Sequence, residues 1–315
     1  MDSGMRSLAL IGAFVLVVLA LPLFVNSGFL LNLAIMVLYT TLIGQAWNIL
    51  GGFGGQFSFG HAVFFGTGAY AMAVLQVNFG ISPWLALPCA IALGALVGLL
   101  LGALSFRYGL KGSYFALVTL AFAEVFRILA NTFDFTGAGV GLQLPLQESV
   151  ASMQFATKAG YLYLVLLLAT AGLLIAWWLK HSRYGAWLAA VRDNEDSAAA
   201  LGVNAFRVKL VAISISGALM AAGGAFYVQL FHYIDPHIAY GTAVSVEALL
   251  AAIIGGMGTI FGPLLGAIVL QGLSELTRNY LDSAPGVSLI VYGALLVLII
   301  MFMPRGIAGL SGRRA

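Results

Sequence analysis

Two ionisable residues stand together inside a strongly apolar stretch of this chain, where a charged group is costly and is therefore a candidate for function. Glu124 and Arg127 lie three residues apart in the segment 113–131. In a helix this spacing puts both side chains on one face, where they can form an ion pair. With a rise of about 1.5 Å per residue, Glu124 would lie near the middle of a roughly 30 Å membrane core. The pair would line a polar pathway, lock two subunits together, or fix the register of the helix.

Other polar residues gather around the first of two glycine-rich interruptions, and could line a passage for a zwitterion. They are Gln45, Asn48, Gln56, Ser58 and His61. His61 alone is also typical of a hydrogen-bonded structural histidine. Another carboxylate, Glu247, begins the apolar segment 242–254 without a local partner. It would cap a half-helix or reach a basic group elsewhere.

The two interruptions share a Gly-Gly-x-Gly core about 200 residues apart. Their glycines are Gly51, Gly52 and Gly54 in the first, and Gly255, Gly256 and Gly258 in the second. Irregular backbone at membrane depth is tolerated only inside protein or along a watery path. Paired breaks in two halves of a chain therefore favour a pseudo-repeat around a translocation route. The alternative is a plain loop followed by close helix packing.

No catalytic or metal-binding constellation stands out. His181, His232 and His237 lie in separate segments without metal-ligand spacing. No nucleophile, base and acid group together, and no G-x-x-x-x-G-K-[ST] phosphate loop occurs. We therefore expect no catalytic residue, no metal and no cofactor on this chain. If a nucleotide powers the protein, another subunit binds it.

The elements that position these residues are membrane helices. Only 8% of the 315 residues are charged, 62% are hydrophobic and the mean hydropathy is +1.03. A soluble domain carries roughly 25% charged residues. The chain also lacks a basic or acidic block that would suit nucleic acid. We predict an all-α polytopic helical bundle, a single transmembrane domain over residues 1–315.

About ten spans with glycine-broken helices are expected, and eight or nine remain possible. The clear spans are 8–25, 29–50, 61–77, 84–106, 113–131, 161–179, 210–231 and 287–303; the less certain ones are 242–254 and 260–278. In the fourth span Gly94, Gly98 and Gly102 recur every four residues, which predicts a helix-packing face. Lys and Arg concentrate near 107–111, 180–209 and 305–314. With ten spans, these loops and both termini lie in the cytoplasm.

The segment 180–209 is the longest polar stretch and carries eight of the 25 charged residues. Its alanine-rich pieces predict a short helix pair outside the bilayer. Asp193, Asn194 or Asp196 would cap the second helix, and Gly202 would end it. Small residues would let this pair enter a groove on a partner. The alternative is an ordinary solvated loop.

Four motifs together resemble the permeases of branched-chain amino acid (high-affinity leucine/isoleucine/valine) ABC importers. The motifs are GQFSFGHA at 55–62, RYG with RDNE and AAALGV within 183–203, GGMGTIFGP at 255–263, and MPRG at 303–306. The resemblance runs from about residue 30 onward and is greatest to the second of the two permease subunits. One departure is Ser197, where the family often has Glu.

The resemblance implies an ATP-driven importer that works by alternating access in a bacterial-type inner membrane. It implies a second, related permease subunit, two cytoplasmic ATPases that bind ATP and Mg, an extracytoplasmic substrate-binding protein, and contact with membrane lipid. The segment 180–209 would dock on an ATPase. The residues expected to couple this segment to the ATPase are Arg183, Gly185, Arg192, Asp193, Asn194, Glu195, Ala199, Leu201 and Gly202.

Two other functions remain open. Permeases for urea or a short amide look similar. A standalone ion-coupled secondary transporter or channel would also explain broken helices and a membrane Glu–Arg pair. It would have no need of the compact basic segment. A membrane enzyme is disfavoured because no catalytic constellation is present.

Overall fold

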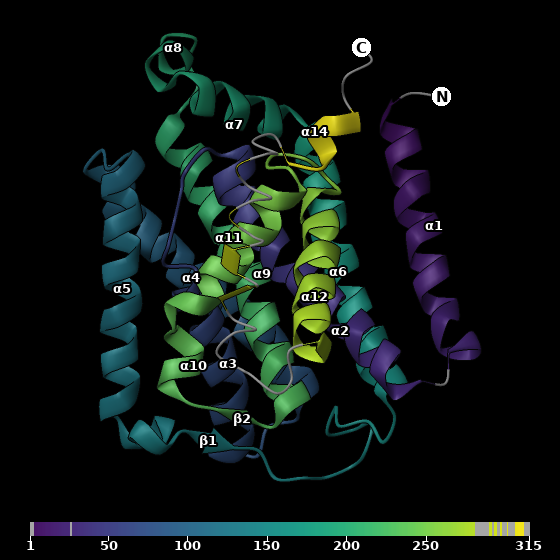
Figure 1. Ribbon diagram of the computed structural model, residues 1–315. Helices are drawn as coiled ribbons and strands as arrows, with labels where there is room; N and C mark the ends of the chain where they lie inside the picture. Colours follow the sequence, from purple (N-terminus) through teal and green to yellow (C-terminus); the bar gives the residue numbers. More distant parts are fainter. Residues whose placement is uncertain are drawn as a thin grey trace.

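The apolar segments fold as long α-helices that run side by side between two polar ends (Figure 1). The structure is a computed structural model that describes residues 3–25, 27–280, 290–291, 293–294, 297, 301 and 306–311. Its longer helices are α1 (Ser3–Phe24), α2 (Gly28–Trp47), α3 (Ala62–Val77), α4 (Pro83–Arg107), α5 (Gly112–Thr132), α6 (Lys158–His181), α7 (Arg183–Asp193), α9 (Ala205–Phe231), α11 (Thr242–Gly255) and α12 (Gly262–Tyr280). Its shorter elements are η1 (Asn48–Phe53), η2 (Asp134–Thr136), η3 (Ala138–Val140), β1 (Leu142–Gln143), α8 (Glu195–Ala200), β2 (Tyr233–Ile234), α10 (Pro236–Tyr240) and α14 (Ala308–Ser311).

Six of the described helices are long and apolar enough to cross a membrane: α1, α2 with its continuation η1, α4, α5, α6 and α9. Helices α3 and α11 are apolar but shorter. The predicted segments 242–254 and 260–278 correspond to α11 and α12, and the predicted span 287–303 lies largely outside the described residues. The prediction of an all-α, multi-pass bundle is confirmed, with six spans supported by length and composition.

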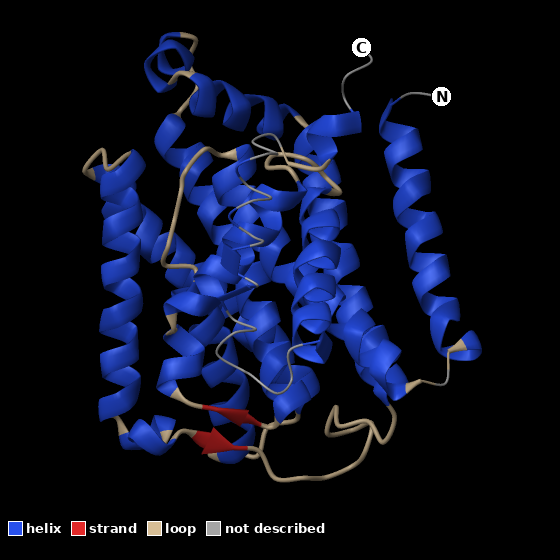
Figure 2. Ribbon diagram, viewed as in Figure 1, coloured by secondary structure: helices blue, strands red, loops and turns tan. Residues whose placement is uncertain are grey.

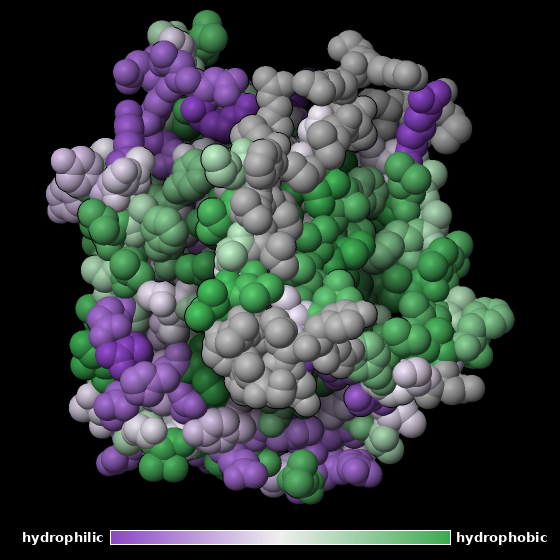
Figure 3. All heavy atoms as spheres, viewed as in Figure 1, coloured by the Kyte–Doolittle hydropathy of each residue, from purple (hydrophilic) through white to green (hydrophobic). Residues whose placement is uncertain are grey.

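The surface carries the same pattern as the sequence. On the face shown in Figure 3, an apolar belt crosses the middle of the molecule, and hydrophilic side chains gather towards both ends. A hydrophilic cluster interrupts the belt over α5 and α10. Helix α1 lies at the edge of the bundle and exposes Leu16 and Leu23, as a lipid-facing helix does.

Helix α9 crosses the centre of the bundle and packs on α3 and α4. Two glycines of α4 allow the backbones to approach closely. A Cβ atom at Gly94 would lie 2.6 Å from the carbonyl oxygen of Gly217, and one at Gly98 would lie 2.7 Å from that of Ile213. The glycine repeat therefore packs helices together, as the sequence predicted.

The first glycine interruption begins as a helical turn rather than as the plain loop considered as the alternative. Helix α2 does not end at Gly51 but widens into the π-helix η1, and the chain leaves helical geometry only at Gly54 and beyond. A π-turn is rare, and it is frequent at functional sites. Glycine at position 51 permits this turn, because a Cβ atom there would overlap the ring of Trp47.

A small antiparallel pair closes the opposite end, away from α7 and α8 (Figure 2). Strand β1 follows α5 through two 3-10 turns, and β2 lies between α9 and α10. Leu142 pairs with Ile234 in this ladder. Helix α10 then begins at Pro236 with its first amides capped by Asp235. The strand pair therefore holds α10 next to α5.

Candidate translocation and coupling sites

The two glycine interruptions meet in space, and two carboxamides from α2 and η1 join them. The side chain of Asn48 donates to the carbonyl oxygen of Thr259 (3.0 Å) and accepts from the amide of Gly258 (2.8 Å). Gln45 donates to the carbonyl oxygen of Ile260 (2.7 Å). Asn48 also donates to Gln45 (2.8 Å). These bonds satisfy backbone groups that the broken helices α11 and α12 leave without helical partners.

The remaining polar residues of the first interruption are buried around the start of α3. Trp47 donates to the carbonyl oxygen of Ser58 (2.9 Å), and the hydroxyl of Ser58 accepts from the amide of Gly60 (3.2 Å). His61 is fully buried, and its Nε2 lies 2.9 Å from the hydroxyl of Ser216. Gln56 donates to the carbonyl oxygen of Gly54 (3.3 Å). The contact between His61 and Ser216 joins the start of α3 to α9, whereas the contacts of Gln56 and of the Ser58 hydroxyl stay within the interruption.

The segment predicted to couple is a helix pair lying across one end of the bundle (Figure 1). Ser182 caps α7 and Asn194 caps α8, so one of the three predicted caps is confirmed. Gly202 follows α8 with φ +87°, the left-handed conformation predicted there. Gly185 packs against the carbonyl group of Leu179, which folds α7 back onto the end of α6.

Arg192 connects this helix pair to both glycine interruptions. Its Nη1 lies 3.5 Å from the carbonyl oxygen of Gly52. A Cβ at Gly258 would lie 3.7 Å from the same nitrogen, and one at Gly55 would lie 2.5 Å from Arg192 Cγ. Asp193 accepts from Arg192 Nε (2.9 Å) and holds the guanidinium in this position. A displacement of α7 would therefore act directly on the junction between the interruptions.

Glu195 anchors α8 through two lysines from different parts of the chain. Lys209, which is 3% exposed, donates to Glu195 at 2.7 Å, and Lys111 lies 2.9 Å from the same oxygen. Burial alone would raise the pKa of Glu195, but these hydrogen bonds outweigh it and hold that pKa below its ordinary value. They also raise the pKa of Lys111. In contrast, Leu201 at the tip of α8 is 85% exposed.

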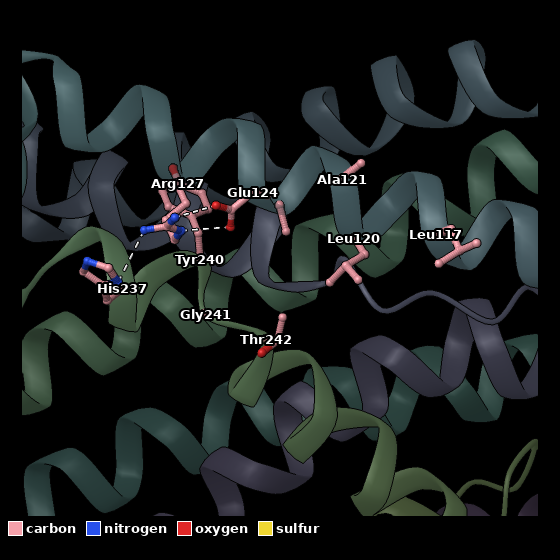
Figure 4. A pocket seen from close by; sticks show the side chains of 10 residues that line it. Leu117, Leu120, Ala121, Glu124, Arg127, His237, Tyr240, Gly241 and Thr242 are labelled. Carbon is pink, nitrogen blue, oxygen red and sulfur yellow. Dashed lines mark hydrogen bonds and ion pairs between the residues drawn. The ribbon is translucent and has the colours of Figure 1, made fainter.

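Glu124 and Arg127 pair on α5, as their spacing predicted, but they are not buried inside the chain. Arg127 Nε donates to Glu124 at 2.9 Å, and Arg127 Nη2 closes a second bond. The side chains are 56% and 26% exposed. They open into a groove of about 530 Å³ between α5 and the α10–α11 region, where Arg127 Nη1 lies 3.4 Å from His237 Nδ1 (Figure 4).

Glu247 has partners that the sequence did not identify. Thr40 of α2 donates to its carboxylate (2.8 Å), and Gln271 of α12 donates to the same oxygen (3.1 Å). Gln271 also donates to Thr40 (2.7 Å). The three residues join three helices at a point separate from the groove and from the glycine junction. The predicted pathway residues thus form three groups rather than one continuous lining.

A family profile described as "Branched-chain amino acid transport system / permease component" matches residues 29–300. The chain belongs to this family. It is 29% identical over 319 residues to the LivM high-affinity branched-chain amino acid permease protein of Salmonella typhimurium, covering 94% of this chain and 73% of the relative. The LivM protein of Escherichia coli K12 is also 29% identical, with 96% and 75% covered.

A probable branched-chain amino acid permease protein, LivH, of Methanocaldococcus jannaschii is 30% identical over 79% of this chain and 81% of its own length. No solved structure matches this chain. The resemblance found in the sequence motifs is therefore confirmed. The matched residues of this permease family member include both glycine interruptions, the helix pair α7–α8 and the groove.

Sequence reasoning missed several residues of these sites. Ser216 and Ser245 are examples: the first contacts His61, and the second accepts from the amide of Ala62 at the start of α3 (2.8 Å). Thr40 and Gln271 are others. All four are polar residues within apolar segments. Gln45 was selected on that property, and the same criterion applied to the whole chain would have found them. Among the described residues, no cluster of His, Cys, Asp or Glu has the arrangement of a metal site.

Proposed function

We propose that this chain imports branched-chain or similar hydrophobic amino acids across a bacterial-type inner membrane. It would act as one of two related permease subunits, with ATP and Mg bound by two separate cytoplasmic ATPases and substrate delivered by an extracytoplasmic binding protein. Membership of the family and the names of its relatives support this function. They do not favour a urea permease or a standalone secondary transporter.

The proposed topology has ten spans and both termini in the cytoplasm. The contact between Lys111 and Glu195 brings two of the basic loops to one end of the bundle. Helix α1 begins at that end, and α14 also lies there (Figure 1). Lys and Arg accumulate on the cytoplasmic side of membrane proteins. These observations support an orientation in which α7 and α8 face the ATPases.

The observation that carries the mechanism is the position of Arg192 against both glycine interruptions. Helix α8 would enter a groove on the ATPase, led by the exposed Leu201. Closure of the ATPases would move α7, and Arg192 would transmit that movement to the junction made by Asn48 and Gly258. Because that junction joins α2 to the α11–α12 break, its movement would change which side of the bundle is open.

Two substitutions test this coupling. We expect Arg192→Glu to reduce ATP-driven leucine uptake about tenfold or more, because a carboxylate would face the Gly52 carbonyl group. We expect Gly202→Val to do the same, because it distorts the tip of α8. Both variants should insert into the membrane normally. Uptake is measured in vesicles of the assembled transporter, with ATP hydrolysis recorded in parallel.

Matched controls separate coupling from general damage. Arg207→Glu makes the same charge change at an exposed position of the same segment, away from the interruptions. Gly109→Val places the same side chain at another glycine with positive φ (+69°), which has no neighbour within 4 Å in the described part of the chain. Both controls should transport nearly as well as the wild type. Normal uptake by Arg192→Glu and Gly202→Val would refute the coupling role.

A further inference from the structure

The groove between α5 and the α10–α11 region changes from polar to apolar along its length. Figure 4 shows His237, Arg127 and Glu124 at one end and Leu120 and Leu117 at the other. The leucines lie one and two turns before Glu124 on the same face of α5. Tyr240, Gly241 and Thr242 line the groove as well. A volume of about 530 Å³ is within the range of roughly 300–1,000 Å³ found for small-molecule sites.

The charged end retains unused hydrogen-bonding capacity. Glu124 receives two bonds from Arg127, but each carboxylate oxygen has two lone pairs and the side chain is 56% exposed. Arg127 Nη1 is directed at His237 Nδ1 over 3.4 Å, which is a weak contact. An ammonium group could therefore bind Glu124, while a carboxylate could bind Arg127 and His237.

We propose that this groove is a docking site for a hydrophobic amino acid as it crosses the membrane. The α-ammonium binds Glu124, the α-carboxylate binds Arg127 Nη1 and His237, and the apolar side chain lies along Leu120 towards Leu117. This inference rests on the proposed function, and it names the substrate contacts within it.

The charge balance favours a zwitterion over an ion. Glu124 and Arg127 are adjacent opposite charges, so a ligand with one charge of each sign, in the opposite order, matches both without adding net charge to the groove. A free acid or a free amine would match only one of them. Leu120 lies seven positions before Arg127, about 10 Å along the helix, which leaves room for an apolar side chain beyond the charged groups.

A reciprocal exchange separates this role from a purely structural ion pair. Glu124→Arg combined with Arg127→Glu keeps a pair at the same spacing but reverses its direction. We expect the KM for leucine uptake by the assembled transporter to rise about tenfold or more, because the charge-assisted bonds are lost. The control is the same exchange at Glu275 and Arg278 of α12, which also lie three residues apart and do not line the groove. The control should keep the wild-type KM.

A second variant and a binding assay cover the case in which the exchange prevents assembly. Glu124→Gln keeps the side-chain shape and should also raise the KM for leucine. Binding of labelled leucine to the purified transporter without the binding protein should be displaced by unlabelled leucine. N-acetylleucine lacks the ammonium and leucinamide lacks the carboxylate, so both should compete poorly.

Three outcomes would overturn the inference. The first is a wild-type KM in Glu124→Gln or in the exchange variant, which would leave a structural pair. The second is equal competition by leucinamide and leucine. The third is an exchange variant that keeps the wild-type KM but no longer co-purifies with zwitterionic phospholipid, which would show that the groove binds a lipid headgroup. Failure of the wild-type transporter to move any amino acid would instead refute the proposed function.

Discussion

The glycine junction and the groove between α5 and α10 both contain polar side chains but use them in opposite ways. At the junction, Gln45 and Asn48 are fully buried and their carboxamides are bonded to backbone groups of the second interruption. In the groove, Glu124 and Arg127 are partly exposed and border open space. The difference indicates that the junction is built to hold helices together, and that the groove is where a molecule from outside the chain can bind.

Local packing explains why the two regions differ. Glycines at the junction bring backbone within contact distance of backbone, so no space remains between the elements. Helix α5 instead lies at the outside of the bundle, and much of its apolar face is exposed. Charged side chains that face lipid would be costly, so the groove side of α5 is expected to face water or a partner subunit.

The largest effect is expected from a single methyl group at the junction. In Gly52→Ala the new Cβ would lie 2.5 Å from the backbone nitrogen of Gly258, and the backbone cannot move without breaking the Asn48 bonds. Overpacking of this kind costs about 1–3 kcal/mol or more. We expect loss of uptake and a clearly lower thermal midpoint of the purified transporter.

Two controls define what that result means. Gly272→Ala adds the same methyl group on α12 where no atom of the described residues lies within 4 Å, and it should be neutral or slightly stabilising. Ala121→Val adds carbons in the open groove and should leave the thermal midpoint unchanged. If Gly52→Ala were as stable as Gly272→Ala, the contrast between a closed junction and an open groove would not hold.

A smaller effect is expected from removing one carboxamide. Asn48→Leu leaves the Gly258 amide and the Thr259 carbonyl group without these side-chain bonds. Both contacts are only part-buried, so each unpaired group costs about 1 kcal/mol, the lower end of the range for a buried group. The thermal midpoint of the variant should therefore fall. Asn78→Leu is the matched control, because Asn78 bonds the carbonyl oxygen of Phe135 at an exposed position (3.0 Å). Equal shifts in the two variants would argue against a structural role for the junction.

Local signals in the sequence were sufficient for some of these features. The cap of α8 and the left-handed Gly202 depend only on neighbouring residues: the sequence predicted Gly202 and placed Asn194 among three candidate caps. The pairing of Glu124 with Arg127 also depends on spacing within one helix. Family motifs added the overall function. The local features share one property, which is that a few neighbouring residues determine each of them.

Contacts between distant residues were beyond such reasoning. Gln45 meets Ile260 across 215 positions, and Arg127 meets His237 across 110. The sequence gives the polarity of each residue but not the helix opposite it. The π-turn at η1 was also missed, because its geometry depends on how Asn48 and Trp47 pack in the folded bundle. The partners of Glu247 were missed for the same reason.

The smallest of these effects is expected at the ion pairs that join α8 to α9 and to the start of α5. Glu195→Gln removes a carboxylate held by Lys209 and Lys111. Charged hydrogen bonds of this kind contribute about 1.5–3 kcal/mol, and partial exposure of Glu195 reduces that value. We expect a modest fall in the thermal midpoint at neutral pH, with little change in the exposed control Asp196→Asn.

The pH dependence of this difference identifies the carboxylate as its cause. The folded-state pKa of Glu195 is lowered, so its contribution is complete above the unfolded pKa of about 4.3 and disappears as the pH falls through the folded pKa. The pKa of Lys111 is raised, so its contribution persists below about pH 10.4 and is lost above that value. The difference in thermal midpoint between the wild type and Glu195→Gln should therefore be largest from about pH 6 to 9 and should disappear in acid. If this difference stayed constant down to pH 3, it would arise from packing, and charge would not be what holds α8 in place.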